Sequence, residues 1–120
     1  MNPPPLPEAA SNIILTTGDR IEGALVTRNL GIVRGNSVRA LGTKGSFKFV
    51  GGGGEVPTMT ELHDTTQREA ERNMVLRAAE LGADAVTVVR YQVTSPSGAL
   101  YSVMCYGTAV TLSDSDKSNG

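Results

Sequence analysis

The sequence predicts a small α+β domain in the order β-β-α-β-β, with one long helix on one face of an antiparallel sheet. Apolar residues recur at spacings of three and four between Met59 and Leu81, which is the period of one helix face. β-branched apolar runs lie on both sides of this segment. Gly82 follows it and can take the positive φ with which a helix ends, so the next strand starts within a few residues.

Length and charge exclude several classes of protein. A chain of 120 residues has room for one domain with one core. The net charge of -1 gives no basic surplus for nucleic acid and no polybasic run for a membrane surface. The start of the chain lacks the pattern of a signal peptide, no apolar run is long enough to span a bilayer, and the single cysteine suits a reducing compartment. We therefore expect a cytoplasmic protein with neither nucleic-acid nor membrane partners.

Both ends of the chain have the composition of tails. Residues 1–12 begin with four prolines in the first seven positions, which favours an extended, solvated chain. Such a segment can serve as a proline-rich ligand, but its shortness favours a flexible terminus. Residues 113–120 contain no large apolar side chain and are expected to be disordered. The folded domain is therefore predicted to span residues 13–112.

The first half of the domain contains two predicted strands. Residues 13–16 form a short apolar run that ends at a turn, and residues 24–38 form a longer one. Gly31 and Gly35 interrupt the longer run, which predicts a bend or the close approach of another backbone. Residues 39–55 are irregular and glycine-rich.

The second half contains the helix and a hairpin. Thr58 and Glu61 have the spacing of a capping box at the start of the helix. Residues 85–94 and 100–112 are predicted strands, joined by a turn at residues 95–98. The predicted buried face of the helix consists of Met59, Leu62, Thr66, Ala70, Met74, Ala78 and Leu81.

Both faces of the last strand are partly apolar, and one helix covers only one face of a sheet. The other face needs a cover, for which self-association is the economical solution; an ordinary two-layer monomer with exposed apolar side chains is the alternative. Alternation places Leu100, Met104, Tyr106, Val110 and Leu112 on one face and Tyr101, Val103, Cys105 and Ala109 on the other.

Two motifs give the chain a family resemblance. Leu81-Gly82-Ala83-Asp84-Ala85-Val86 joins the helix to the third strand, and Gly107-Thr108-Ala109-Val110 lies in the fourth. With the strands before the helix and a Gly-Gly pair in front of it, the chain resembles the YbjQ family. The resemblance implies a dodecin-like α+β domain, a ring-shaped homopentamer and the label "putative heavy-metal-binding", with no defined biochemical role. Residues 39–55 depart from the family pattern, so nothing is carried over there.

The residues themselves offer little for a metal. Cys105 and His63 are the one thiol and the one imidazole of the chain, and soft or borderline ions need three or four such ligands. A ring would bring several copies of Cys105 or His63 together, so a soft divalent metal ion between subunits is the hypothesis for a cofactor. The alternatives are a buried cysteine that acts as a small apolar residue and a solvated histidine near the helix start.

Two further groups of residues have candidate roles. Gly51, Gly52, Gly53 and Gly54 precede the helix N-terminus, where backbone N–H groups favour an anion, although a mobile surface loop is the favoured explanation. Gly82, Asp84, Gly107 and Thr108 are interpreted as structural, with the Asp84 carboxylate accepting local backbone N–H bonds.

No arrangement typical of catalysis is present, so the expected function is non-enzymatic. We expect a homo-oligomeric ring, a pentamer by the resemblance, that binds a heavy-metal ion or a small anion at subunit interfaces. The alternative is a structural scaffold without a ligand.

Overall fold

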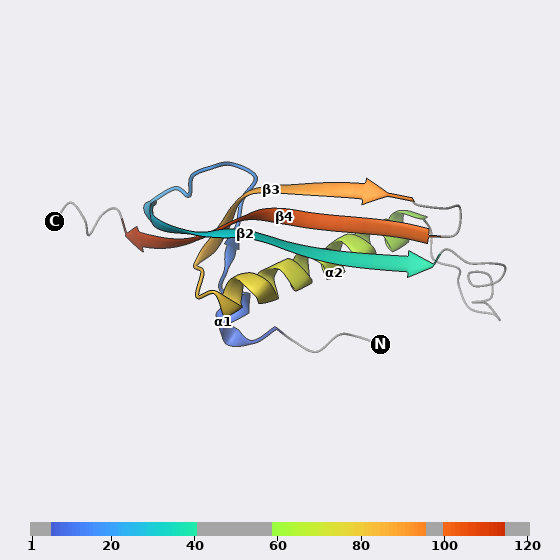
Figure 1. Cartoon of the computed structure of the whole chain (residues 1–120), viewed down its shortest axis with the longest axis horizontal. Helices are drawn as coiled ribbons and strands as arrows, with labels where there is room; N and C mark the ends of the chain where they lie inside the picture. The colour runs from blue at the N-terminus through green and yellow to red at the C-terminus, as the bar shows by residue number, and fades with distance from the viewer. Residues whose placement is uncertain (1–5, 41–58, 96–99, 115–120) are drawn as a thin grey trace.

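A computed structural model describes residues 6–40, 59–95 and 100–114 of the chain (Figure 1). In this part of the chain the elements follow the predicted order, with one short helix added in front. They are α1 (Glu8–Ser11), β1 (Ile14–Leu15), β2 (Ala24–Ala40), α2 (Met59–Glu80), β3 (Ala85–Thr94) and β4 (Leu100–Asp114).

The described strands form one mixed sheet in the order β1-β3-β4-β2. β4 is antiparallel to both β2 and β3, as predicted. β1 is parallel to β3, with Ile14 opposite Ala85, so the expectation of a wholly antiparallel sheet is wrong at this edge. The reason is topological: β1 lies beside β3, and the chain reaches β3 only after a crossover through β2 and α2 that returns it in the direction of β1.

The ends of the domain extend beyond residues 13–112. α1 lies within the segment expected to be a disordered tail, and it packs against α2. Ala10 is 2% exposed, so the expectation that residues 1–12 contribute nothing to the core is wrong at this position. One turn with a single buried methyl group has no amphipathic period, which is why the sequence pattern did not reveal it. β4 continues to Asp114.

β2 is the long, bent strand that the glycines predicted. Its pairing with β4 shifts register between Val26 and Arg28 and again between Asn29 and Gly31, where Gly31 has a φ of 110°. Gly35 allows the close approach of another backbone, because a Cβ at this position would overlap the backbone of α2. The helix therefore lies directly on the strand.

The buried face of α2 is largely the predicted one. Thr66, Ala70, Met74 and Ala78 are all 0% exposed, and the Thr66 hydroxyl donates to the Leu62 carbonyl oxygen at 2.7 Å. Leu81 is 49% exposed, contrary to the prediction, because α2 ends at Glu80 and the backbone then turns away from the helix axis.

Gly82 ends the helix as predicted, with a φ of 81°. Its N–H donates to the Ala79 carbonyl at 3.0 Å, and the N–H of Ala83 donates to the Ala78 carbonyl at 3.1 Å. This pair of bonds is a Schellman motif, which satisfies two of the last carbonyl groups of the helix. Ala83 and Ala78 are both in the core, so the motif also fixes the path of the chain into β3.

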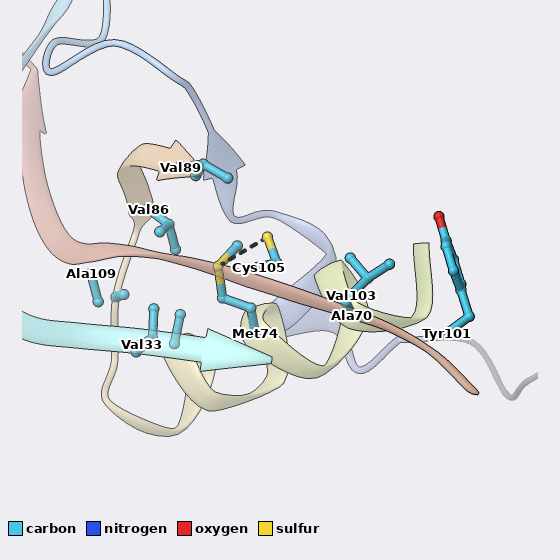
Figure 2. Close-up of a cluster of buried hydrophobic side chains, with 11 residues drawn as sticks. Val33, Ala70, Met74, Val86, Val89, Tyr101, Val103, Cys105 and Ala109 are labelled. Carbon is cyan, nitrogen blue, oxygen red and sulfur yellow. Dashed lines mark hydrogen bonds between the residues drawn. The ribbon is translucent and has the colours of Figure 1, made fainter. Parts of the chain in front are cut away.

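The core lies between α2 and the sheet (Figure 2). Side chains at alternate positions of β4 enter it, among them Tyr101, Val103, Cys105 and Ala109. Met74 from the helix and Val86 from β3 fill the space between the layers, and both are fully buried.

α2 covers β2 and β4 but barely touches β3 (Figure 1). Tyr91 and Val93 are paired with Cys105 and Val103, so they share the helix side of the sheet. They are nevertheless 39% and 46% exposed. One face of the outer half of β3 therefore has no cover from its own helix.

Candidate functional site

Cys105 occupies the centre of the core. Its Sγ lies 3.5 Å from the Sδ of Met74, and both side chains are 0% exposed (Figure 2). The position follows from alternation along β4, because Cys105 shares its face with Val103 and Ala109. The thiol thus fills an apolar site beneath the helix rather than a cleft.

Glu71 and Tyr91 lie beside this thiol. The Tyr91 hydroxyl donates to Glu71 Oε2 at 2.5 Å, which joins β3 to α2. Burial and the charge of Glu71 raise the pKa of Cys105 to about 11, and burial and the hydrogen bond to Glu71 raise the pKa of Tyr91. The thiol is therefore protonated at neutral pH, whereas both nucleophilic attack and metal ligation require the thiolate.

His63 lies elsewhere, in the first part of α2. Its Nδ1 contacts the hydroxyl of Tyr101, and the two rings meet edge to face with centroids 5.6 Å apart. Tyr101 precedes Cys105 by four residues on β4, a separation of about 13 Å along a strand.

The structure thus places the two candidate metal ligands in different parts of one subunit. In the described residues, no group of three or more His, Cys, Asp or Glu side chains is arranged to hold a metal ion. A shared site for Cys105 and His63 within one chain has no geometric support. Their predicted role between subunits remains a prediction.

The glycine run falls outside the described residues. The predicted anion loop, Gly51, Gly52, Gly53 and Gly54, therefore gains no structural account.

The residues assigned to structural motifs meet where β1, β3 and β4 come together. The backbone N–H of Leu112 donates to Asp84 Oδ2 at 2.8 Å, and the N–H of Asp84 donates to the Val110 carbonyl at 2.8 Å. The Asp84 carbonyl accepts from Ile14 at 3.2 Å. Asp84 thus accepts a backbone N–H bond as predicted, but its partner is in β4 rather than in the adjacent turn.

Gly107 is required by the close packing of β3 on β4. A Cβ at this position would stand 2.7 Å from Val86 Cγ1 and 2.8 Å from the Thr87 carbonyl oxygen. Thr108 follows and pairs with Thr87 on one side and Ile32 on the other. Gly107 and Thr108 therefore have structural roles in the pairing and packing of the sheet.

Sequence reasoning missed the contact between Tyr91 and Glu71. Nothing in the sequence pattern showed that the helix residue Glu71 would meet the phenol of Tyr91 on the uncovered part of β3. A single polar residue beside the apolar stripe of an amphipathic helix is a weak signal, because many such residues are simply solvated.

The fold and the two motifs define a class of small α+β proteins in which one long helix packs on a mixed four-stranded sheet. A family model described as "Putative heavy-metal-binding" matches residues 13–113, and the chain belongs to this family, the YbjQ family. The resemblance found in the motifs is confirmed.

Relatives cover most of the chain. A "UPF0145 protein" of Methanococcus vannielii is 34% identical over 105 residues, which are 83% of this chain and 98% of that protein. A "UPF0145 protein" of Chromobacterium violaceum is 39% identical over 104 residues, which are 82% and 87% of the two chains. The crystal structure of a protein of unknown function, a DUF74 family member from Pediococcus pentosaceus, is similar in fold, with a TM-score of 0.61 at 18% identity, covering 84% of this chain and 98% of that chain.

None of these names states an activity. Within the described residues, no helix has the length and apolar character needed to cross a membrane.

Proposed function

We propose that the protein is a non-enzymatic, self-assembling ring protein, a pentamer by family resemblance, whose subunit interfaces form its functional surface. The observation that carries this proposal is the apolar surface that the chain leaves uncovered on both sides of its sheet. Large apolar side chains exposed on a folded monomer in such numbers are typical of an association surface.

On the helix side, the uncovered surface is the outer half of β3, with Tyr91 and Val93. On the opposite side, Ile32 and Val38 of β2 are 68% and 58% exposed. Burying side chains of this size stabilises an interface by about 1.5–3 kcal/mol each when they become fully covered. Two faces at opposite edges of one sheet favour a head-to-tail contact, which closes into a ring when the rotation is suitable.

The open edges of the described sheet support the same proposal. β2 spans 17 residues and pairs with β4 on one side only. A long edge strand without a cover offers its unpaired backbone N–H and C=O groups to another chain, and natural proteins commonly cover such an edge. A neighbouring subunit would provide the cover.

Sedimentation velocity of Val93→Lys and Ile32→Lys tests the assignment of these faces. Each lysine would bury a charge in the interface, so each variant is expected to sediment as a smaller species than the unmodified protein. Thr94→Lys is the matched control, since Thr94 is also exposed at the end of β3. Unchanged sedimentation of both apolar variants would contradict the proposed interface.

Soft-metal binding is the second candidate, and the family description is the observation that favours it. His63 is the more accessible of the predicted ligands, being half-buried, whereas Cys105 is in the core. A metal between subunits would therefore rely on His63 at an interface, while coordination by Cys105 would require the core to open.

Metal analysis of protein purified without a histidine tag distinguishes a metal-binding function from a structural scaffold without a ligand. A binding protein is expected to carry stoichiometric zinc, copper or nickel, and to lose it in His63→Ala. A Cys105→Ser control reports whether the thiol contributes. Absence of stoichiometric metal, with no thermal shift when these ions are added, would exclude metal binding. The structural scaffold would then be the remaining function.

A further inference from the structure

The sheet formed by the described residues has two open edges. One edge is β2, which pairs with β4 alone. At the other edge, β1 covers only the start of β3, and the chain after β1 binds it as far as Val89, whose N–H donates to the Thr16 carbonyl at 3.0 Å. From Arg90 to Val93, no described strand lies on the outer side of β3. Both edges can therefore accept a strand from another chain.

Backbone groups point outward on both of these edges. The bond from Val89 to the chain after β1 turns its N–H away from β4, and alternation along the strand turns the groups of Tyr91 and Val93 the same way. On β2, the Asn36 carbonyl accepts the Asn73 side-chain amide at 2.8 Å, so this residue is also turned away from β4. Its N–H, on the same side of the strand as its carbonyl, faces the open edge.

The two open edges match in direction and in level. β2 and β3 are both antiparallel to β4, so they run in the same direction. Met104 of β4 pairs with Asn36 of β2 on one side and with Gln92 of β3 on the other, so the two open stretches lie level with each other. A rotation axis that runs along the strands preserves both direction and level around a head-to-tail ring. The β2 edge of one subunit then meets the β3 edge of the next in parallel.

The position of α2 favours the same arrangement. The helix lies over β2 and β4 and leaves Tyr91 and Val93 of β3 exposed on its own side of the sheet (Figure 1). A neighbour whose β2 lies beside this β3 brings its own α2 next to the two exposed side chains. A groove of about 540 Å³ between β2 and α2, with Asn73 and Leu76 in its helix wall, offers space for them. The cover that β3 lacks is thus available at the opposite edge of a second copy.

We infer that residues 90–93 of β3 pair in parallel with residues 34–37 of β2 in the next subunit, which joins the sheets of the ring into one continuous sheet. This inference rests on the proposed self-assembly and specifies its interface. The occupant of the open edge is a second copy of this chain, and the α2 of that copy covers Tyr91 and Val93. Main-chain hydrogen bonds hold the strands together, and the buried side chains fix their register.

Cysteine cross-linking of the full chain tests this pairing. Asn36 and Gln92 are both exposed and lie on the face of the sheet opposite to Cys105. Within one chain β4 separates them by about 9.5 Å, beyond the limit of about 7 Å between the Cα atoms of a disulfide. A disulfide in Asn36→Cys/Gln92→Cys therefore joins two subunits. After mild oxidation we expect most of this variant to migrate as covalent oligomers in non-reducing electrophoresis. Each single variant is expected to remain one chain, because Cys105 is buried.

Two further pairs determine the direction of the strands. Parallel pairing places Arg34 beside Arg90 of the next subunit, so Arg34→Cys/Arg90→Cys is expected to cross-link, whereas Arg34→Cys/Thr94→Cys would cross-link only antiparallel strands. Sedimentation velocity before oxidation measures assembly separately. Oligomers without a cross-link between positions 36 and 92, or with a cross-link at 34 and 94 in place of 34 and 90, would overturn the pairing and leave self-assembly standing. A monomeric unmodified protein would overturn both.

Discussion

Gly35 of β2 lies directly against the carbonyl of Ala70 in α2, with no side chain between the two backbones. A Cβ at position 35 would overlap the Ala70 oxygen and the backbone nitrogen of Met74. This contact fixes the distance between helix and sheet. It therefore underlies both the closed core around Cys105 and the narrow gap between β2 and α2.

Gly35→Ala tests this contact. Because the new methyl group meets backbone atoms that cannot rotate away, the substitution is expected to destabilise the fold by about 2–3 kcal/mol. Chemical denaturation at fixed protein concentration measures the loss. Gly18→Ala is the control, since a Cβ there would stand 3.7 Å from Thr16 Oγ1, an ordinary contact. Equal stability of the two variants would contradict the close approach.

Val88 is a second backbone feature with a measurable consequence. Its φ of 54° is positive, which is strained for a β-branched residue, and the register of β3 against β4 shifts between Thr87 and Arg90. Strain of this kind costs about 1–3 kcal/mol. Val88→Gly is therefore expected to keep or raise the stability, although glycine normally weakens a strand.

Thr94→Gly is the control for that substitution, because Thr94 is also β-branched and exposed in β3. It is expected to lose about 1 kcal/mol in the same denaturation experiment. A loss at Val88 as large as the loss at Thr94 would show that the positive φ carries no strain.

The sequence predicted the elements whose signals are local. The bounds of β3 and the positive φ of Gly82 are confirmed, because a β-branched run and a helix-ending glycine depend on a few neighbouring residues. The close approach at Gly35 was also foreseen as one of the meanings of a glycine inside a strand.

Features that depend on distant pairing were not predictable in the same way. The parallel pairing of β1 with β3 is set by where the crossover returns the chain, and two paired residues leave no pattern in the sequence. The separation of His63 from Cys105 and the contact of Glu71 with Tyr91 depend on how α2 is placed over the sheet. The spacing of residues along the chain does not determine where the helix lies on the sheet.

Asp84 provides a test of the structural interpretation of the family motif. Asp84→Asn keeps an oxygen that can accept the Leu112 N–H bond, so the melting temperature and the oligomer mass are expected to stay nearly unchanged. Asp84→Ala removes the acceptor and is expected to cost about 1–2 kcal/mol. A bound cation that is lost in Asp84→Asn, with stability intact, would assign this residue to a ligand site instead.

The raised pKa of Cys105 predicts a stability that falls in alkaline solution. Burial and the charge of Glu71 bring this pKa from 9.0 to about 11 in the folded protein. Below pH 9 the thiol is protonated in both the folded and the unfolded chain, and its contribution to the free energy of unfolding is fully present. Above pH 9 the unfolded chain loses this proton first, so the free energy of unfolding falls until the pH reaches about 11.

Comparison with Cys105→Ala isolates this effect from other titrating groups. Between pH 8 and about 10.5, the unmodified protein is expected to lose about 1–2 kcal/mol more stability than the variant. Parallel curves for the two proteins would show that the thiol does not titrate differently in the folded state. The raised pKa of Tyr91 acts in the same direction but is present in both proteins.

Self-assembly is the central claim, and native mass spectrometry of the full, untagged chain at micromolar concentration tests it most directly. The uncovered side chains of β2 and β3 predict a single closed oligomer, and the family resemblance predicts five times the 12.6 kDa mass of the chain. A closed oligomer of another size would support self-assembly and change only the number of subunits. A monomer at this concentration would contradict the account, because the exposed apolar faces would then have no partner of the proposed kind.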